Sequence, residues 1–459
     1  MSAKGTIASL TLYVNRGITP KYTEDKERAI PVLNQKCIRG HKVNLEPARL
    51  NDLSKRKVTA EKILEKYDVL INSTGVGTLG RVAQFYGETG SATVDSHVTI
   101  VRPNPELIDP IYFGYLVKFK QSLIEGFAEG TTGQTELARD SVKELVVEYI
   151  DDYKTQKQVG LALLAIDKKI EINRQTNQTL EHIAQAIFKS WFVDFEPTRA
   201  KIAAIQAGQD PEPAAMAAIS GKALDELVQL NSEQQAQLKT TAALFPDALV
   251  DLELGEIPEG WEVMLNGDVM DVRDGTHDSP KQSETGFPLV TSKHITSGVL
   301  EIKNAYLISV KDYDKVNKRS QVNQGDILLT MIGTVGIPYL VVQPDVNFAI
   351  KNVGLFRTSE IKGLKNYFYL LLKSPEMKAY LDARMVGTTQ KYLSLKTLRS
   401  LEMLTPSAEI LSKFNGSIDP VMDKIFSSIC ENNELSELRD GLLPKLLSGE
   451  LEPQGAVGA

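Results

Sequence analysis

The chain has 459 residues, of which 42% are hydrophobic and 24% are charged, so we expect two or three globular domains. Its net charge of −7 argues against a protein that coats nucleic acid indiscriminately, although a reader of one sequence can carry its basic side chains locally. The absence of a long apolar run, of a signal-peptide pattern and of a CxxC pair (the two cysteines are Cys37 and Cys430) predicts a cytoplasmic protein with no membrane span and no structural zinc.

Residues 1–150 show the short apolar runs and turns that are typical of a mixed α and β domain. Residues 67–71 and 98–101 predict buried strands, and residues 111–119 predict a helix packed on the sheet. Residues 75–80 have the glycine spacing of a phosphate-binding loop, but Arg81-Val82 follows where such a loop needs Lys and a hydroxyl residue. This segment therefore predicts a tight turn.

Residues 151–197 predict a long helix, because an apolar stripe alternates spacings of four and three residues. The stripe consists of Val159, Leu163, Ile166, Ile170, Asn173, Asn177, Leu180, Ala184, Ile187 and Trp191. Asn173 and Asn177 either fix the register of a coiled coil, the favoured interpretation, or interrupt its seam locally. The run that starts at Trp191-Phe192 is either core for the next segment or a partner surface, with the partner surface slightly favoured.

Residues 198–257 are rich in Ala, Pro, Gln and Asp, and we interpret them as a linker with short helices, or else as a wholly disordered linker. Residues 258–405 predict a second mixed domain, with a buried strand at 325–329 and a helix at 367–372. Residues 406–459 predict a second long helix, whose stripe contains Ile418, Met422, Ile425, Ile429, Leu435, Leu438, Leu442 and Leu446.

The second half of the chain repeats the first. Matching segments occur in the same order: Pro31-Val32-Leu33 with Pro288-Leu289-Val290, Gly77-Thr78-Leu79-Gly80 with Gly333-Thr334-Val335-Gly336, Tyr112-Phe113 with Tyr367-Phe368, Gly130-Thr131-Thr132 with Gly387-Thr388-Thr389, and Asn177 with Asn433. Because domain and helix alternate, we expect the helices to pair antiparallel about a pseudo-two-fold axis. The expected fold class is α+β: two mixed α/β domains related by an internal repeat and separated by two long antiparallel coiled-coil helices.

Motifs of catalysis are missing. Glu301-Ile302-Lys303 could end a nuclease metal site, but the equivalent Asn44-Leu45-Glu46-Pro47 has no Lys, which favours a solvated strand end. No Asn-Pro-Pro-aromatic motif of an adenine methyltransferase occurs, and the five histidines lack metal-ligand spacing. The sequence favours a protein without catalytic or metal-binding residues, and a coiled-coil adaptor that never touches DNA is a rival.

Four segments resemble motifs of the specificity subunits of type I restriction–modification systems. They are Pro258-Glu259-Gly260-Trp261-Glu262, Gly325-Asp326-Ile327-Leu328-Leu329-Thr330 with its following Gly-Thr-x-Gly, Trp191-Phe192-Val193-Asp194-Phe195-Glu196-Pro197, and the ending from Leu438 to Leu451. The resemblance covers essentially the whole chain. One departure is that the first domain lacks an opening Pro-Glu-Gly-Trp near Lys4, so the motif does not predict a first strand there.

The resemblance implies that each domain is a target-recognition domain for one half of a bipartite DNA site. The helices would set the gap and dock modification (methyltransferase) subunits, of which two are expected, together with restriction subunits that carry motor and nuclease. It implies no cofactor on this chain, since S-adenosylmethionine, ATP and Mg belong to the partner subunits, and no enzymatic activity of its own.

Loops with Lys, Arg, Gln and Thr suit contacts with phosphates and base edges, although a solvated side chain is an equal alternative at each position. The candidates for DNA contact are Lys36, Arg39, Lys55, Arg56, Lys57, Thr131, Thr132, Gln134, Lys293, His294, Lys318, Arg319, Thr388, Thr389, Gln390, Lys391 and Tyr392. The candidates for helix pairing or partner contact are Ile166, Ile170, Asn173, Asn177, Leu180, Ile187, Trp191, Phe192, Ile425, Ile429, Leu435, Leu438, Leu442 and Leu446.

Overall fold

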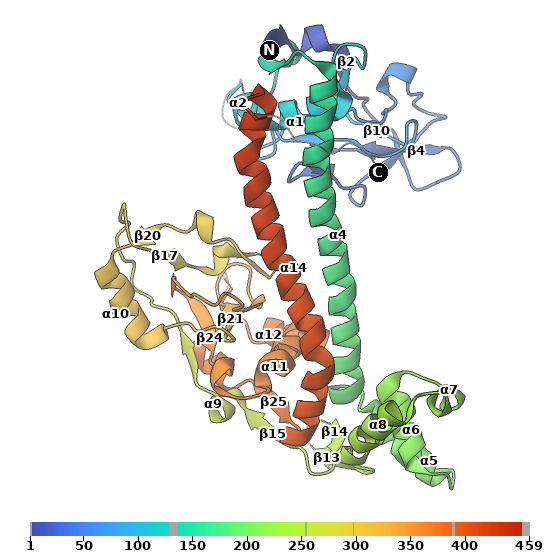
Figure 1. Cartoon of the computed structure of the whole chain (residues 1–459), viewed down its shortest axis with the longest axis vertical. Coiled ribbons are helices and arrows are strands. Elements are labelled where there is room, and N and C mark those ends of the chain that lie inside the picture. The colour runs from blue at the N-terminus through green and yellow to red at the C-terminus, as the bar shows by residue number, and fades with distance from the viewer. Residues whose placement is uncertain (1, 128–135, 253–254, 297, 388–390, 452–459) are drawn as a thin grey trace. The chain divides into compact units, whose positions relative to one another are not determined.

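The computed structural model describes residues 2–127, 136–252, 255–296, 298–387 and 391–451. The chain forms two compact units, the first from Met1–Asn173 with Cys430–Ala459 and the second from Arg174–Ile429. Each unit joins an α/β domain to parts of the two long helices α4 (Tyr153–Phe192) and α14 (Ala408–Ser448), which are labelled in Figure 1. The boundary between the units falls inside both helices.

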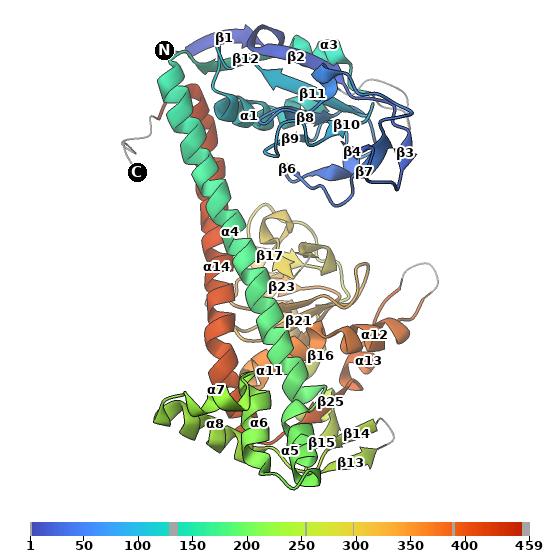
Figure 2. The same ribbon diagram turned by 90° about the vertical axis from the view of Figure 1, so that its right-hand side faces the viewer.

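The domain of the first unit is built on two four-stranded sheets (Figure 2). One has the antiparallel order β2 (Thr11–Arg16), β11 (Val98–Pro103), β8 (Val69–Asn72), β9 (Val82–Gln84). The other has the order β10 (Thr93–Val94), β4 (Ala29–Leu33), β7 (Arg49–Asp52), β3 (Tyr22–Thr23), with β10 parallel to β4. Two antiparallel ribbons join β1 (Ser2–Thr6) to β12 (Val146–Ile150) and β5 (Ile38–Arg39) to β6 (Lys42–Val43). A first strand is therefore present although the opening motif is not.

Helix α1 (Pro110–Phe119) covers the first of these sheets. Asp109 caps it by accepting hydrogen bonds from the backbone N–H groups of Ile111 and Tyr112, and Pro110 occupies its first turn. Gly160 of α4 lies against its start, where a Cβ atom would stand 2.8 Å from the backbone nitrogen of Tyr112, so only glycine permits this approach. The remaining helices of this domain are α2 (Gln121–Glu125), α3 (Arg139–Lys143), η1 (Ala8–Leu10), η2 (Gln35–Cys37) and η3 (Ala60–Lys62).

The domain of the second unit repeats this plan. Its main sheet has the antiparallel order β16 (Val272–Asp274), β24 (Val353–Phe356), β21 (Ile327–Thr330), β22 (Pro338–Leu340). Beside it are β20 (Leu307–Ile308), β17 (Phe287–Val290) and β23 (Ala349–Ile350), with β17 parallel to β23. Antiparallel ribbons pair β15 (Glu262–Leu265) with β25 (Glu402–Thr405), β18 (Ile295–Thr296) with β19 (Val299–Leu300), and β13 (Leu249–Leu252) with β14 (Gly255–Pro258).

The repeat predicted from the sequence is thus present as a repeat of topology. Strands β2, β11, β8 and β9 correspond to β16, β24, β21 and β22, and the ribbon β1–β12 corresponds to β15–β25. Helix α11 (Leu364–Lys373) takes the place of α1. The other helices of the second domain are α9 (Asn266–Val269), α10 (Val310–Ser320), α12 (Pro375–Ala383), α13 (Leu395–Arg399), η4 (Ser292–His294), η5 (Ile302–Asn304) and η6 (Thr358–Glu360).

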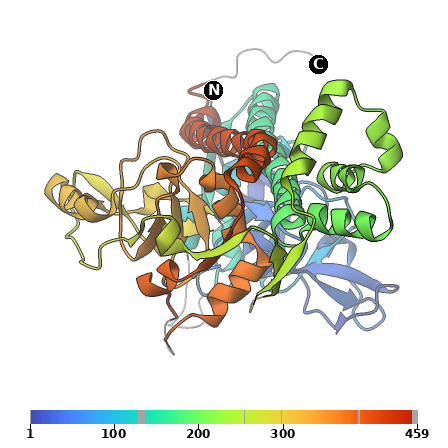
Figure 3. The same ribbon diagram turned by 90° about the horizontal axis from the view of Figure 1, so that it is seen from below.

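The segment interpreted as a linker holds four helices of the second unit. They are α5 (Glu196–Gln206), α6 (Pro211–Ser220), α7 (Leu224–Val228) and α8 (Ser232–Leu244). Ala215, Met216, Leu227 and Ala242 form a small core between them. In Figure 3 these helices lie to one side of the long helices, away from the main sheet of the same unit.

The aromatic run at the end of α4 belongs to the core of the second unit. Trp191 and Phe192 are buried, and the ring of Phe192 lies 4.9 Å from those of Tyr367 and Phe414. Trp191 packs edge-on against Phe245, with ring centroids 5.1 Å apart. The favoured expectation that this run forms a partner surface is therefore wrong, because aromatic residues distant in the sequence cover it.

The apolar stripes form the buried faces of α4 and α14. Ile170 and Ile425 are buried, as is Leu446, whereas Ile166, Leu180, Ile187, Ile429, Leu435 and Leu442 are half-buried. Leu438 is 50% exposed and lies outside the seam. Within the first unit Asn173 Nδ2 donates to Glu431 Oε2 at 2.8 Å, and within the second Asn177 Nδ2 donates to the carbonyl of Ile425 at 3.2 Å. None of the helices in the described parts of the chain contains an apolar stretch that could span a lipid bilayer.

Candidate functional site

In each domain one end of the sheets is assembled from four backbone segments, which together we call the sheet edge. In the first unit these are η2 after β4, the turn 73–81 after β8, residues 95–97 before β11, and residues 136–137. Asp95 N donates to Leu33 O at 2.9 Å, and Leu137 N donates to Ser73 O at 2.8 Å. These hydrogen bonds bring together segments that lie far apart in the sequence.

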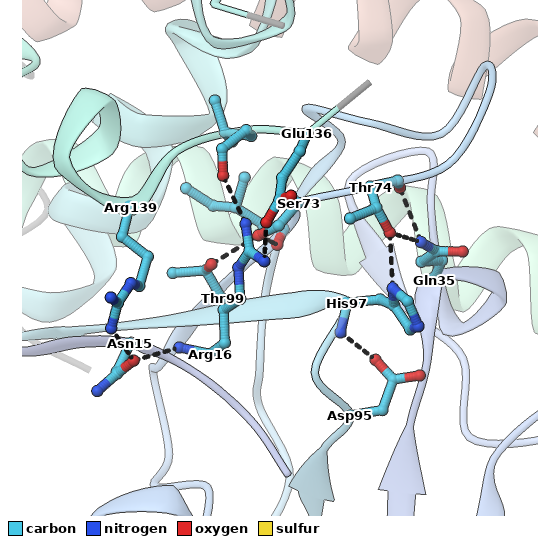
Figure 4. A network of polar contacts seen from close by, with 12 residues as sticks. Asn15, Arg16, Gln35, Ser73, Thr74, Asp95, His97, Thr99, Glu136 and Arg139 are labelled. Carbon is cyan, nitrogen blue, oxygen red and sulfur yellow. Dashed lines mark hydrogen bonds and ion pairs between the residues drawn. The ribbon is translucent and has the colours of Figure 1, made fainter. Parts of the chain in front are cut away.

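A chain of polar side chains lines the sheet edge of the first unit (Figure 4). Gln35 Nε2 donates to the backbone oxygen of Thr74 at 2.8 Å and also to its hydroxyl. The hydroxyl of Thr74 lies 2.8 Å from Nδ1 of His97, whose backbone N–H donates to Asp95 at 2.9 Å. Burial raises the pKa of Asp95, although that backbone hydrogen bond opposes the shift. Gln35 and Thr74 are half-buried and His97 is exposed, so the chain ends at solvent.

A second group of contacts fixes the segment that starts at residue 136 (Figure 4). Arg16 forms an ion pair with Glu136 and donates to the carbonyl of Leu137 at 2.8 Å. Arg139 donates to Asn15 Oδ1 at 2.9 Å. Three of the predicted contact residues, Thr131, Thr132 and Gln134, lie outside the described residues, directly before this segment.

The sheet edge of the second unit has the same construction with other side chains. Ser292 accepts hydrogen bonds from the backbone nitrogens of Met331 and Ile332 and donates to the carbonyl of Asn352. Nδ1 of His277 lies 2.8 Å from Oδ1 of Asn352, and Nε2 of the same ring lies 3.0 Å from the carboxylate of Asp274. Arg319 of α10 pairs with the same carboxylate of Asp274, while Lys351 donates to Ser279 at 2.5 Å.

Several predicted contact residues lie at these edges. Lys36 and Lys293 are exposed at equivalent positions of η2 and η4, and Arg39 is exposed at the end of β5. Lys391 and Tyr392 are exposed, and Tyr392 pairs through its backbone with Ile332. Lys318 is exposed beside Arg319 on α10. Thr388, Thr389 and Gln390 lie outside the described residues.

The structure does not bring Lys55, Arg56 and Lys57 to the sheet edge. They follow Asp52, which pairs with Ala29 at the start of β4, whereas η2 follows the end of that strand. All three side chains are exposed. They therefore form a separate basic cluster at the other end of β4.

His294 does not reach the surface. The residue is 2% exposed, and its Nδ1 accepts a hydrogen bond from the backbone of Thr291, which caps η4. Burial lowers its pKa, and the charge of Lys293 acts in the same direction. The prediction that His294 contacts DNA is therefore wrong, because the side chain holds the turn from inside the domain.

Gln35, Thr74, His97, Lys351 and Asn352 were missed by the sequence analysis. They lie in separate loops without periodicity, and only the fold brings Gln35, Thr74 and His97 together in the first unit and places Lys351 and Asn352 at the edge of the second. No sequence signal marked them. Two glycines beside these edges are required by the fold, since a Cβ atom at Gly17 or Gly275 would lie 1.9 or 2.4 Å from the carbonyl oxygens of Val94 or Ile350.

The chemistry available at both edges is that of hydrogen bonding and local positive charge. Among the described residues no group of three His, Cys, Asp or Glu side chains could hold a metal ion. Amides, hydroxyls and imidazoles suit base edges, and Lys and Arg suit phosphates. The arrangement is that of a recognition surface.

Comparison with known proteins gives consistent results. The family model for the type I restriction modification DNA specificity domain matches residues 258–438. The type I restriction enzyme HindI specificity subunit of Haemophilus influenzae is 32% identical over 414 residues, covering 85% of this chain and 88% of the relative. The MjaIX specificity subunit of Methanocaldococcus jannaschii is 24% identical over 347 residues, covering 74% and 68%. The crystal structure of the type I S subunit from M. genitalium has a similar fold, with a TM-score of 0.53 and 16% identity over 97% of this chain and 96% of that one.

Proposed function

The chain belongs to the specificity subunits of type I restriction enzymes, non-catalytic subunits that recognise DNA, and on this basis we propose that it reads a bipartite target. Each α/β domain would read one half-site with its sheet edge, and the bases between the half-sites would remain unread. One observation carries this proposal: the same sheet edge is built twice, once in each unit, on the same topology.

We further propose that the long helices dock modification and restriction subunits. Large apolar side chains are exposed on the part of α4 in the first unit at Leu161 and Ile172, about three helical turns apart and hence on one face. A partner helix that covers this face would remove apolar surface from water. S-adenosylmethionine, ATP and Mg would be bound by those partner subunits in the cytoplasm, and none by this chain.

The test is to express the full chain with its modification subunits and to map methylated positions in DNA by sequencing. We expect a target with two specified parts and a fixed unspecified gap. A continuous target, or methylation without sequence preference, would contradict the proposal. Leu161→Asp with Ile172→Asp should reduce copurification of the modification subunits, whereas Lys66→Ala, an exposed change within the domain of the first unit, should not.

A further inference from the structure

The sheet edges of the two units share one backbone frame. Asp95 N donates to Leu33 O at 2.9 Å, and its counterpart Lys351 N donates to Val290 O at 2.8 Å. Gly80 N donates to Asn72 O at 2.8 Å, and Gly336 N donates to Thr330 O at 2.9 Å, with φ of 81° and 82° at the two glycines. The two edges therefore share these backbone hydrogen bonds, although the loops between them differ in length. Three residues, Asp95 to His97, precede β11, but only Lys351 and Asn352 precede β24, and the turn after β8 is two residues longer than the turn after β21.

Buried side chains hold this frame in both units. Cys37 and His294, both buried, occupy the third position of the turns η2 and η4, and each accepts a hydrogen bond from the backbone of the capping residue, Asn34 or Thr291. Leu137 and Leu393 are buried at the returning segments, where their backbone nitrogens donate to Ser73 and Met331. The frame is thus fixed by residues that point away from solvent.

The side chains on the frame differ in chemistry at five pairs of positions. The pairs are Gln35 and Ser292, Thr74 and Ile332, Asp95 and Lys351, His97 and Asn352, and Glu136 and Tyr392. An amide is exchanged for a hydroxyl, a hydroxyl for an aliphatic group, and a carboxylate for an ammonium group. Since both edges have the same topology, the topology does not require these differences.

Hydrogen-bonding groups remain available at both edges. Among the described residues, the amide oxygen of Gln35 and Nε2 of His97 have no partner in the first unit, and neither do the amide nitrogen of Asn352 and the hydroxyl of Tyr392 in the second. A carbonyl acceptor such as that of Gln35 suits the exocyclic amine of adenine or cytosine, and the ammonium group of Lys351 suits the two acceptors of guanine.

We propose that these five pairs of positions determine which base pairs each domain reads. The inference rests on the proposed function, since it assumes that each unit reads one half-site. The shared frame presents the edge to DNA, and the exposed and half-buried side chains of these pairs select the sequence. The buried Asp95 and Ser292 act indirectly, because they hydrogen-bond to the backbone of the neighbouring residues His97 and Asn352. Lys36 and Lys293, which are alike in both units, contact phosphate and carry no sequence information.

The experiment uses the full chain with its modification subunits and maps the methylated target for two variants. Gln35→Ser with Thr74→Ile and His97→Asn transfers second-unit side chains to the first unit. It should alter or relax the first half-site, with a loss of discrimination of about tenfold or more at one position, and leave the second half-site and the gap unchanged. Lys351→Ala with Tyr392→Ala should alter or relax the second half-site and leave the first half-site and the gap unchanged.

The control is Lys55→Ala with Lys57→Ala, in the separate basic cluster of the first unit, which should keep the wild-type base preference at every position. If the triple variant does not fold, the single changes Gln35→Ala and His97→Ala carry the same test. Retention of both half-sites with undiminished discrimination in the first-unit variants would overturn the inference. A wild-type target that is not bipartite would instead overturn the proposed function.

Discussion

Asp167 of α4 accepts a hydrogen bond from Arg439 of α14 at 2.7 Å and thereby joins the two long helices within the first unit. The hydroxyl of Tyr115 in α1 donates to the same carboxylate at 2.6 Å. Burial alone would raise the pKa of Asp167, but the hydrogen bonds from Tyr115 and Arg439 outweigh it and hold the pKa below its usual value. One carboxylate thus fastens the domain to both helices.

Asp167→Asn should lower the free energy of unfolding of the first unit by about 1 to 3 kcal/mol at neutral pH, because two hydrogen bonds to a charged group are weakened. The folded-state pKa of Asp167 is depressed, so its contribution is present above the unfolded pKa and is lost as the pH falls through the folded pKa. The free energies of unfolding of wild type and variant, measured with urea, should therefore begin to converge only as the pH falls below about 4. Lys169→Ala, in an exposed pair with Glu431, is the control and should change stability by less than about 1 kcal/mol. Equal effects of the two substitutions would contradict the prediction.

Lys118 leads us to expect that the free energy of unfolding rises with pH on the alkaline side. Burial lowers the pKa of Lys118 to about 8, and its ammonium group lies 4.6 Å from the centre of the Tyr115 ring. Between that value and the unfolded pKa of about 10.4, the unfolded chain binds more protons, so stability rises with pH. Thermal unfolding from pH 7 to 10 should show this rise in wild type and not in Lys118→Met. If stability rises equally with pH in both proteins, groups other than Lys118 cause the rise and the prediction is wrong.

Because Phe192 lies in the aromatic core of the second unit, we expect Phe192→Ala to lower the free energy of unfolding strongly. Removal of this buried ring should cost about 3 to 5 kcal/mol, because it leaves a cavity between Tyr367 and Phe414. Val228→Ala, at a side chain that is 78% exposed, should cost less than about 0.5 kcal/mol. Denaturant unfolding followed by Trp fluorescence measures both, and a small effect of Phe192→Ala would show that the run is peripheral.

Asn177→Leu should stabilise the second unit by up to about 1 kcal/mol. Asn177 is buried on the apolar stripe, and its side-chain oxygen has no partner although its nitrogen donates to Ile425. Replacing a half-satisfied buried amide by an apolar side chain of similar size removes that cost. Chemical denaturation decides the outcome, and a clear loss of stability would show that the bond to Ile425 outweighs the unpaired oxygen.

A circular permutant should fold and recognise the same target. Ser2 pairs with Ile150, and a Cβ atom on Gly449 would lie 3.4 Å from that same Ile150, so Ser2 and Gly449, near the two limits of the described residues, approach one residue of the first unit. A short flexible linker can join them, with new ends at Gln209 between α5 and α6. Methylation by the permutant with modification subunits is the measurement. Loss of folding would show that the connection between α5 and α6 is essential.

The sequence predicted the elements whose signal is local. The strands around Leu70 and Leu328, the helices α1 and α11 and both long helices follow from periodicity and turns. Exposure was harder to predict, because it depends on distant partners: Trp191 is buried by residues such as Phe245 and Phe414, and Leu438 carries the apolar signal of the stripe yet faces solvent. The polar chain from Gln35 to His97 was beyond prediction, since its members are individually unremarkable.

The order of synthesis gives the end of α14 a particular role. Leu446 and Leu447 belong to the same buried cluster as Val159 and Leu163, and Tyr112 donates to the carbonyl of Leu447 at 2.8 Å. The ribosome makes the domain of the first unit early but delivers these leucines only after the whole second unit. Until then the part of the cluster that Leu446 and Leu447 cover is exposed, and such apolar surface on an incomplete chain favours aggregation. The core of the first unit is therefore completed only after the second unit has been made, and a stop codon before Leu446 would leave that core incomplete.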